Sequence, residues 1–207
     1  MFTGIVEKTG KIVHIENDQT NVHFTVETPI AKELKIDQSM SHDGVCLTVV
    51  KVDHDKNQYV VTAMQETLDC TNLRTWALGT EVNLECSMRL DGRFDGHVVQ
   101  GHVDQTAVCE KVEVLDGSWK FYFSYEVKKD FFTVGKGSIC VNGVSLTVVD
   151  SDPGMFSVAI IPYTFNETNF RNVQKGTVVN IEFDVFGKYV ARLFEEYIKA
   201  RGMENFN

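Results

Sequence analysis

The sequence is poor in proline, in basic residues and in long apolar runs. It has 3 prolines among 207 residues and is 43% hydrophobic, which excludes a Pro-rich or disordered chain. Acidic residues outnumber basic ones by 29 to 20, so the chain lacks the basic field that neutralises nucleic-acid phosphates. Its apolar runs are too short for a membrane span. We therefore expect a globular protein with neither a nucleic-acid nor a membrane partner.

Cysteine is sparse and carries no pairing motif. The 5 cysteines are scattered singly, without a Cys-x-x-Cys pair. An odd number of isolated cysteines fits a reducing compartment better than a disulfide framework. The first residues also lack a basic leader followed by an extended apolar stretch. These absences predict a cytoplasmic protein.

The chain carries the same module twice. Residues 43–50 (DGVCLTVV) and 142–149 (NGVSLTVV) are identical at six of eight positions. Shorter matches, such as the segments that begin at Gly4 and Gly101, occupy corresponding places in the two halves. Because unrelated segments almost never agree to this extent, the sequence is a duplicated module. Differences in reactive groups between the copies are therefore informative.

Short β-strands dominate the predicted secondary structure. Runs rich in Thr, Val and Phe, such as 22–26, 45–52 and 156–161, are separated by Gly, Asp or Asn turns. Many short strands at close spacing are typical of barrels and sandwiches. The polar stretch 91–96 precedes the second copy, and we place the junction between the modules there.

The C-terminal segment has a different pattern. From residue 187, apolar side chains recur at helical spacing, which predicts an amphipathic helix that ends near Gly202 and has no counterpart after the first module. Its apolar stripe is buried either on its own barrels or in a partner, and both alternatives stay open here. The predicted domains are residues 1–95, 96–186 and 187–207.

Cys46 and Ser145 occupy the same place in the two modules, and each is followed two residues later by Thr48 or Thr147. Residues two apart on a strand face the same side, so each module presents one Cys or Ser and one Thr together. Rows of hydroxyls suit a polyol chain, because each can donate and accept a hydrogen bond. The alternative is that these are hydroxyls on solvated strands.

His97 and His102 stand five residues apart in the segment GHVVQGHVD (residues 96–104), and Gly101 directly precedes His102. Five residues apart on a strand means opposite faces, and no further ligands follow at suitable spacing, so we expect no metal site. The missing side chain of Gly101 allows a flat ligand to approach the backbone beside His102. His97 is expected to be a structural histidine satisfied by a neighbour.

Together these segments resemble the riboflavin synthase family, whose members contain two lumazine-binding repeats. The resemblance covers essentially the whole chain and rests on MFTGIV, GVCLTV, GVSLTV, GHVVQGHVD, ETL with TNL, IPYT and DVFGKYV. It implies an all-β fold of two tandem six-stranded Greek-key antiparallel barrels plus a C-terminal α-helix. It also implies a homotrimer held by that helix and an association with lumazine synthase.

The resemblance further implies the reaction. Two molecules of 6,7-dimethyl-8-ribityllumazine exchange a four-carbon unit at a subunit interface, giving riboflavin and 5-amino-6-(ribitylamino)uracil without a cofactor or metal. The alternative is a non-catalytic, antenna-type protein of the same fold that binds lumazine or flavin.

The family motifs nominate the site residues. Candidate catalytic residues are His102, Cys46, Ser145, Thr48 and Thr147. Implied substrate-binding residues are Gly4, Ile5, Val6, Cys46, Leu47, Thr48, Thr62, Ala63, Met64, Gln65, Glu66, Thr67, Gly101, His102, Val103, Lys136 (at a neighbour's ligand), Ser145, Leu146, Thr147, Ala159, Ile160, Ile161, Pro162, Tyr163 and Thr164.

One position departs from the family pattern. Asp43 stands in the first-half turn, where the family commonly carries Asn. Both residues suit the turn, so we expect no change of fold. A negative charge on Asp43 would lie near the first pocket and would put the affinity or pH dependence of that pocket in question.

Overall fold

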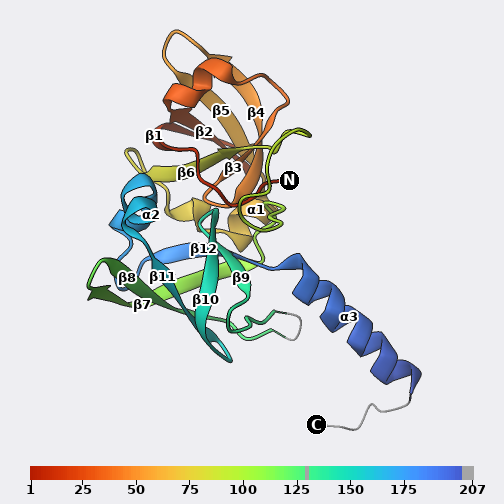
Figure 1. Cartoon of the computed structure of the whole chain (residues 1–207). Helices are drawn as coiled ribbons and strands as arrows, with labels where there is room; N and C mark the ends of the chain where they lie inside the picture. The colour runs from red at the N-terminus through yellow and green to blue at the C-terminus, as the bar shows by residue number, and fades with distance from the viewer. Residues whose placement is uncertain (129–130, 202–207) are drawn as a thin grey trace.

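The computed structural model describes residues 1–128 and 131–201, which form two closed barrels and a C-terminal helix (Figure 1). The first barrel contains β1 (Lys8–Asp18), β2 (Asn21–Glu27), β3 (Ser39–His42), β4 (Val45–Asp53), β5 (Gln58–Ala63) and β6 (Glu81–Cys86), with η1 (Pro29–Glu33), α1 (Gln65–Cys70) and η2 (Asn72–Thr75). The second contains β7 (Gln105–Leu115), β8 (Ser118–Tyr125), β9 (Ser138–Val141), β10 (Val144–Asp152), β11 (Met155–Ile160) and β12 (Val178–Phe183), with α2 (Pro162–Glu167) and η3 (Asn169–Asn172).

The two barrels have the same strand order. The first closes as β1-β2-β5-β4-β3-β6, and the second, read from β7, closes as β7-β8-β11-β10-β9-β12. All paired strands are antiparallel. The predicted fold class, two six-stranded antiparallel barrels plus a C-terminal helix, is therefore confirmed.

Each barrel has its own hydrophobic core. Along the strands apolar side chains point inward at alternate positions, as a closed sheet with a filled interior requires. On β5, for example, Tyr59, Val61 and Ala63 are fully buried. In the second core the ring of Phe121 packs edge-on against Phe170, with centroids 5.2 Å apart. The buried residues of each core come from one module only.

Matching turns join β3 to β4 and β9 to β10. Asp43 and Gly44 have φ of 47° and 83°, and Asn142 and Gly143 have φ of 44° and 78°. Two successive positive φ values are characteristic of the two-residue hairpin turn that Asp-Gly and Asn-Gly favour. These turns fix the register of the hairpins that carry Cys46 and Ser145.

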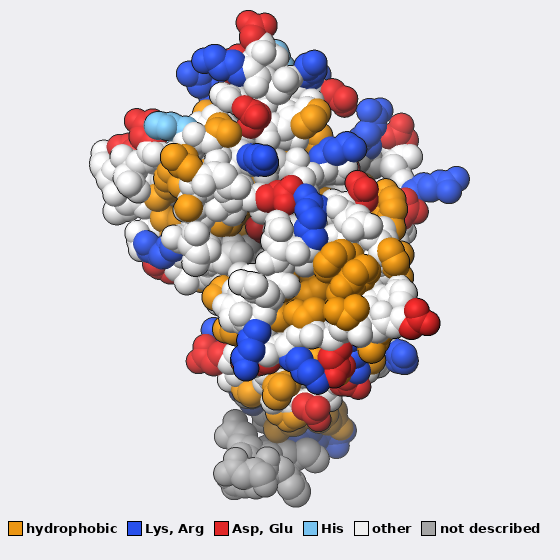
Figure 2. Space-filling model, turned by 90° about the vertical axis from the view of Figure 1, so that its left-hand side faces the viewer, with side chains coloured by type: hydrophobic (Ala, Val, Ile, Leu, Met, Phe, Trp, Pro, Cys, Tyr) orange, Lys and Arg blue, Asp and Glu red, His pale blue; other side chains and the backbone are white. Residues whose placement is uncertain are grey.

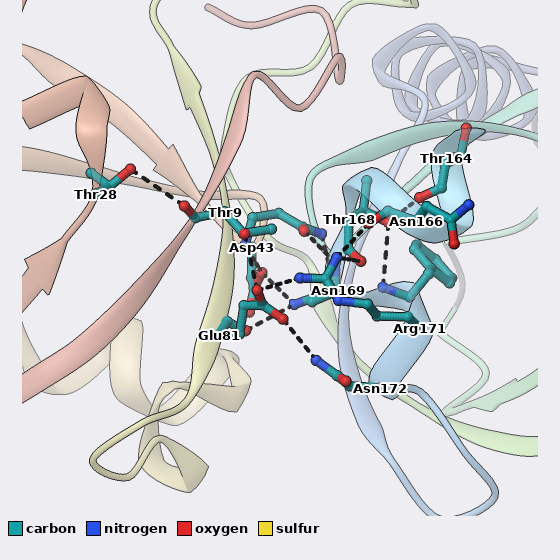
Figure 3. A network of polar contacts seen from close by, with 12 residues as sticks. Thr9, Thr28, Asp43, Glu81, Thr164, Asn166, Thr168, Asn169, Arg171 and Asn172 are labelled. Carbon is teal, nitrogen blue, oxygen red and sulfur yellow. Dashed lines mark hydrogen bonds and ion pairs between the residues drawn. The ribbon is translucent and has the colours of Figure 1, made fainter. Parts of the chain in front are cut away.

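A buried polar network joins the barrels around a pseudo-twofold axis. The Asn83 side-chain amide donates to the Asn142 carbonyl (2.8 Å), and the Asn180 amide donates to the Asp43 carbonyl (2.9 Å). Figure 3 shows Asp43 facing Asn169 across the interface, where the Asn169 amide donates to its Oδ1 (2.9 Å). Because satisfied buried networks are geometrically demanding, this one fixes how the barrels sit on each other.

Asp43 itself is a buried acid in this network. Burial raises the pKa of its carboxyl to about 8, assisted by the nearby charge of Glu81 and opposed by hydrogen bonds from Asn83 and Asn169. The group is therefore protonated near neutral pH and lies at the barrel interface. The expected negative charge near the first pocket was wrong, because the sequence alone did not reveal this burial.

Replacing Asp43 by Asn is expected to stabilise the protein by an amount that grows with pH. The carboxyl titrates near 3.8 when unfolded and near 8 when folded, so wild-type stability falls as pH rises between these values. The amide carries no such proton, and Asn142 shows that an amide fits the equivalent site. Urea unfolding should show a gain that is smallest near pH 4 and grows by about 1.4 kcal/mol per pH unit up to the folded pKa, so that it reaches several kcal/mol in alkaline solution. A gain independent of pH would contradict the protonation argument.

The C-terminal helix α3 (Val185–Ala200) projects away from both barrels (Figure 1). It begins two residues before the predicted start, because Asp184 caps it by accepting from the Phe186 N–H at 3.0 Å. Lys188 anchors its first turn on the Asp104 carboxylate at 2.7 Å. The predicted helix end near Gly202, and with it residues 202–207, lies outside the described residues.

The apolar stripe of α3 is uncovered in the single chain. Six of its side chains are at least half exposed: Phe186, Tyr189, Val190, Leu193, Phe194 and Tyr197. The stripe therefore does not pack on the protein's own barrels, which was one of the two alternatives.

The surface of the barrels carries both signs of charge. In Figure 2, Lys and Arg side chains lie among Asp and Glu side chains, and an apolar patch covers part of the lower barrel. Within residues 1–128 and 131–201, no helix has the length and apolar character needed to cross a membrane.

Candidate functional site

The first candidate site, which we call the first pocket, is defined by a row of side chains on the outer face of β4. Cys46 is half-buried and Thr48 is exposed, whereas Leu47 between them points into the core. The two side chains thus share one face, as strand geometry requires. Their partners across the sheet on β3 are Ser41 and Ser39, which extend the row of polar side chains. Neither serine was predicted from the sequence, because the pairing of β3 with β4 had to be known to find them.

The second candidate pocket repeats this arrangement on β10. Ser145 is half-buried, Thr147 is exposed, and Leu146 between them packs in the second core. The partners on β9 are Cys140 and Ser138. The two rows therefore differ chemically. In the first row Cys46 on β4 faces Ser41 on β3, whereas in the second row Ser145 on β10 faces Cys140 on β9.

Most of the remaining predicted residues lie at the ends of β5 and β11 and in the segments that follow these strands. In the first barrel, Thr62 and Ala63 end β5, Met64 follows, and residues 65–67 begin α1. In the second barrel, Ala159 and Ile160 end β11, Ile161 follows, and residues 162–164 begin α2. Ala63 and Ile160 are buried, so they offer backbone rather than side chain to a ligand. The Thr62 hydroxyl lies 2.8 Å from His23 Nδ1, and the sequence did not indicate that this histidine is its partner.

Two irregular segments cross between the barrels, and each contacts the candidate row of the barrel that it reaches. We call residues 2–6 the N-terminal arm and residues 97–103 the linker arm. The arms pair with each other through Phe2 and Val99, whose N–H groups donate reciprocally at 2.7 and 3.1 Å. They then diverge toward opposite barrels.

The linker arm reaches the first pocket. The Gly101 carbonyl accepts from the Cys46 N–H at 2.9 Å, and Val103 packs against the first core. His102, between them, is exposed. The arm therefore places Gly101 directly against Cys46, with His102 and Val103 following it. A Cβ on Gly101 would lie 2.6 Å from Cys46 Cβ and 2.9 Å from Phe2 Cε2, so the missing side chain makes room for these two residues and not for the flat ligand that the sequence had suggested.

The N-terminal arm reaches the second pocket. The Gly4 carbonyl accepts from the Ser145 N–H at 2.7 Å, and Val6 packs against the second core. Gly4, Ile5 and Val6 thus lie beside Ser145 rather than beside Cys46 of their own module. The predicted residues form two groups, each drawn from both halves of the chain.

His97 belongs to the second pocket. Its Nδ1 lies 2.7 Å from Ser145 Oγ, and its N–H donates to the Thr3 carbonyl at 3.1 Å. Burial lowers the pKa of the His97 ring, an effect that Asp184 opposes, so the ring is neutral near pH 7. The sequence correctly predicted a histidine satisfied by a neighbour, but that neighbour is a candidate catalytic residue.

Lys136 lies beside β10, next to the second group. It occupies the turn before β9 with φ of 69°, and its N–H donates to the Val148 carbonyl at 2.9 Å. Its role at a neighbouring subunit's ligand stays a prediction. Within the described residues, no group of three or more His, Cys, Asp or Glu side chains is arranged to hold a metal ion.

The comparisons with known proteins agree with this architecture. Residues 3–87 and 100–184 each match the lumazine binding domain, so the fold and paired pockets define a protein with two lumazine-binding domains. Riboflavin synthase of Actinobacillus pleuropneumoniae is 38% identical over 92% of this chain and 88% of its own length. Riboflavin synthase of Bacillus subtilis is 37% identical over 95% of this chain and 91% of its own length. Riboflavin synthase of Schizosaccharomyces pombe is 34% identical over 96% of each chain. The chain belongs to the riboflavin synthase family.

Solved structures show the same fold. LumP complexed with 6,7-dimethyl-8-(1'-D-ribityl)lumazine superimposes with a TM-score of 0.79 at 22% identity, over 88% of this chain and 99% of LumP. LumP complexed with riboflavin gives 0.80 at the same identity, over 88% and 98%. At this level of identity the likeness establishes the fold alone.

Proposed function

We propose that the protein catalyses the dismutation of two 6,7-dimethyl-8-ribityllumazine molecules to riboflavin and 5-amino-6-(ribitylamino)uracil, a transferase reaction. The observation that carries this proposal is the pair of equivalent pockets, each a row of Cys, Ser and Thr side chains completed by a crossing arm. Two pockets suit a reaction between two copies of one substrate. The hydroxyl rows suit the ribityl chain, because each hydroxyl can donate and accept a hydrogen bond.

The main contribution of such a site is proximity. Holding two reactants in register converts a bimolecular step into one that resembles a unimolecular step, with a large saving in entropy. In one chain, Cys46 and Ser145 lie on different barrels. We therefore propose that the first pocket of one subunit faces the second pocket of its neighbour in a homotrimer held by the uncovered stripe of α3.

Proton transfer is the remaining requirement. One lumazine loses a proton from its ring methyl and the other accepts a nucleophile. Neutral His97, hydrogen-bonded to Ser145, is suited to exchange a proton through that hydroxyl. At the first pocket, His102 and Cys46 lie in the corresponding region, with Thr48 beside them. The pockets thus differ in chemistry while sharing a shape.

The five cysteines are free, which supports a reducing compartment such as the cytoplasm.

Cys46→Ala and Ser145→Ala are expected to slow turnover by unequal factors, with the larger loss at Ser145 because that substitution also removes the partner of His97. Loss of one hydrogen bond alone costs about 0.5–1.5 kcal/mol, or up to roughly tenfold. A fall well beyond tenfold at saturating lumazine would indicate a role in the chemical step. Small and equal effects would mean that both residues only line the pockets and would leave His102 as the principal proton carrier.

The proposed function is tested by incubating the purified chain with the ribityllumazine and following riboflavin fluorescence. Sustained riboflavin formation without added cofactor is expected. Tight binding without turnover would instead favour an antenna-type protein, and neither binding nor turnover would exclude both.

A further inference from the structure

Two buried glutamates occupy matching places at the ends of the repeats. Glu85 lies on β6 and Glu182 on β12, the last strands of their barrels, and they are 5% and 2% exposed. Neither is among the residues that the family motifs nominate. A carboxylate buried this deeply requires several hydrogen-bond donors. In both cases the arms supply them.

Glu182 holds the linker arm. Its Oε1 accepts from the Gln100 N–H at 2.7 Å, and its Oε2 accepts from the N–H groups of Gly101 (2.9 Å) and His102 (3.0 Å). Successive N–H groups that converge in this way form a concave backbone site for an anion. The carbonyl of the same Gly101 binds Cys46, so a carboxylate of the second barrel fixes one edge of the first pocket.

Glu85 holds the N-terminal arm by the corresponding contacts in the other half of the molecule. Its Oε1 accepts from the Thr3 N–H (2.7 Å) and the Thr3 hydroxyl (3.0 Å), and its Oε2 accepts from the Gly4 N–H (3.0 Å). The Gly4 carbonyl then accepts from Ser145 in the second pocket. Each glutamate therefore acts on the opposite barrel.

We propose that Glu85 and Glu182 are positioning residues, each holding the arm that completes the pocket of the opposite barrel. The inference rests on the proposed function in that the pockets bind lumazine or flavin. The proposal has a distinctive consequence, because each substitution acts on the other barrel. A change of Glu182 on β12 affects the pocket on β4, and a change of Glu85 on β6 affects the pocket on β10. A glutamate that merely stabilised its own barrel would have no such crossed effect.

The charge state of Glu182 sets the conditions for a test. Burial raises its pKa to about 7, whereas the N–H donors and Lys188 lower it and Asp104 raises it further. Burial likewise raises the pKa of Glu85, against the hydrogen bonds from the arm. Binding is therefore best measured well above pH 7, where the Glu182 side chain is a carboxylate.

The experiment titrates the full chain with riboflavin, which serves as the probe, and follows the methyl NMR signals of Thr48 and Thr147 as reporters of the two pockets. Glu182→Gln preserves shape but replaces an acceptor oxygen by an amide nitrogen that cannot accept. It should weaken riboflavin binding about tenfold at the Thr48 pocket and leave the Thr147 pocket within about twofold of the unsubstituted protein. Glu85→Gln should give the reverse, so each variant is the control for the other.

The failures are distinguishable. If riboflavin shifts neither methyl in the unsubstituted protein, the proposed function fails. If it shifts both, but each variant affects its own barrel, both pockets equally or neither pocket, the positioning role fails. Should a glutamine variant not fold, Thr3→Val removes only the hydroxyl bond to Glu85. It should weaken the Thr147 pocket alone, by about two- to fivefold, and an equal effect at both pockets would overturn the proposal.

Discussion

Removal of residues 187–207 is expected to leave folded barrels that bind ligand but lose turnover by about 100-fold or more. The barrels have separate cores to which α3 contributes no buried residue, so their folding does not depend on it. Turnover does depend on it, because the helix carries the uncovered stripe that we propose assembles the subunits. The measurements are molecular mass in solution, riboflavin affinity and rate at saturating lumazine.

A point variant separates assembly from other effects of truncation. Truncation also deletes Lys188, which pairs with Asp104. Leu193→Asp keeps that ion pair and the helix but places a charge in the middle of the stripe, so it should give the same loss of mass and rate. A truncated chain that remains fully active as a monomer would contradict the proposal that the reaction crosses between subunits.

Gly101→Ala is expected to reduce turnover by about 100-fold while the barrels stay folded. Gly101 has φ of 81°, and an added Cβ would lie 2.6 Å from Cys46 Cβ and 2.9 Å from Phe2 Cε2. The linker arm must therefore move away from β4, which separates His102 from Cys46 and Thr48. Steady-state rates and the melting temperature of the variant check this expectation.

Gly117→Ala is the matched control. Gly117 has nearly the same φ, 79°, but a Cβ there would meet nothing within 4 Å. Both variants thus incur the strain of an L residue at positive φ, about 1–2 kcal/mol, and only Gly101→Ala adds the collision. Comparable rates for the two variants would show that contact between the arm and β4 is not needed for turnover.

Much of the fold was predictable from the sequence because its signals are local or repeated. The DGVCLTVV and NGVSLTVV copies identified the duplication, and alternation along the strands placed Cys46 with Thr48 and Ser145 with Thr147. The helical spacing after residue 187 identified α3. The resemblance to a family added barrel closure, which strand patterns alone do not distinguish from a sandwich.

The crossing of the arms could not be predicted in this way. Nothing in the order of residues says whether Gly4 joins the barrel of its own module or the other, since the contact with Ser145 spans most of the chain. His97 appeared structural for the same reason. Asp43 was interpreted as a charged turn residue, although its burial at the interface raises its pKa and leaves it uncharged near neutral pH. These features depend on how two folded modules pack.

Glu85 and Glu182 are an intermediate case. Both follow a Val-Asn-Leu or Val-Asn-Ile run at matching places in the repeat, a signal that comparison of the two copies contains. Their neighbours on β6 and β12 are buried, so a glutamate that persists there in both copies indicates a buried carboxylate with dedicated donors. The identity of those donors still required the structure.

The measurement that tests the account most directly is the product balance of the reaction. The purified chain is incubated with 6,7-dimethyl-8-ribityllumazine, and riboflavin, 5-amino-6-(ribitylamino)uracil and remaining substrate are quantified by chromatography over time. Transfer of a four-carbon unit between two molecules predicts equal amounts of the two products and two substrate molecules consumed for each riboflavin formed. Riboflavin without an equal amount of the uracil, or substrate that stays bound and unchanged, would contradict the account.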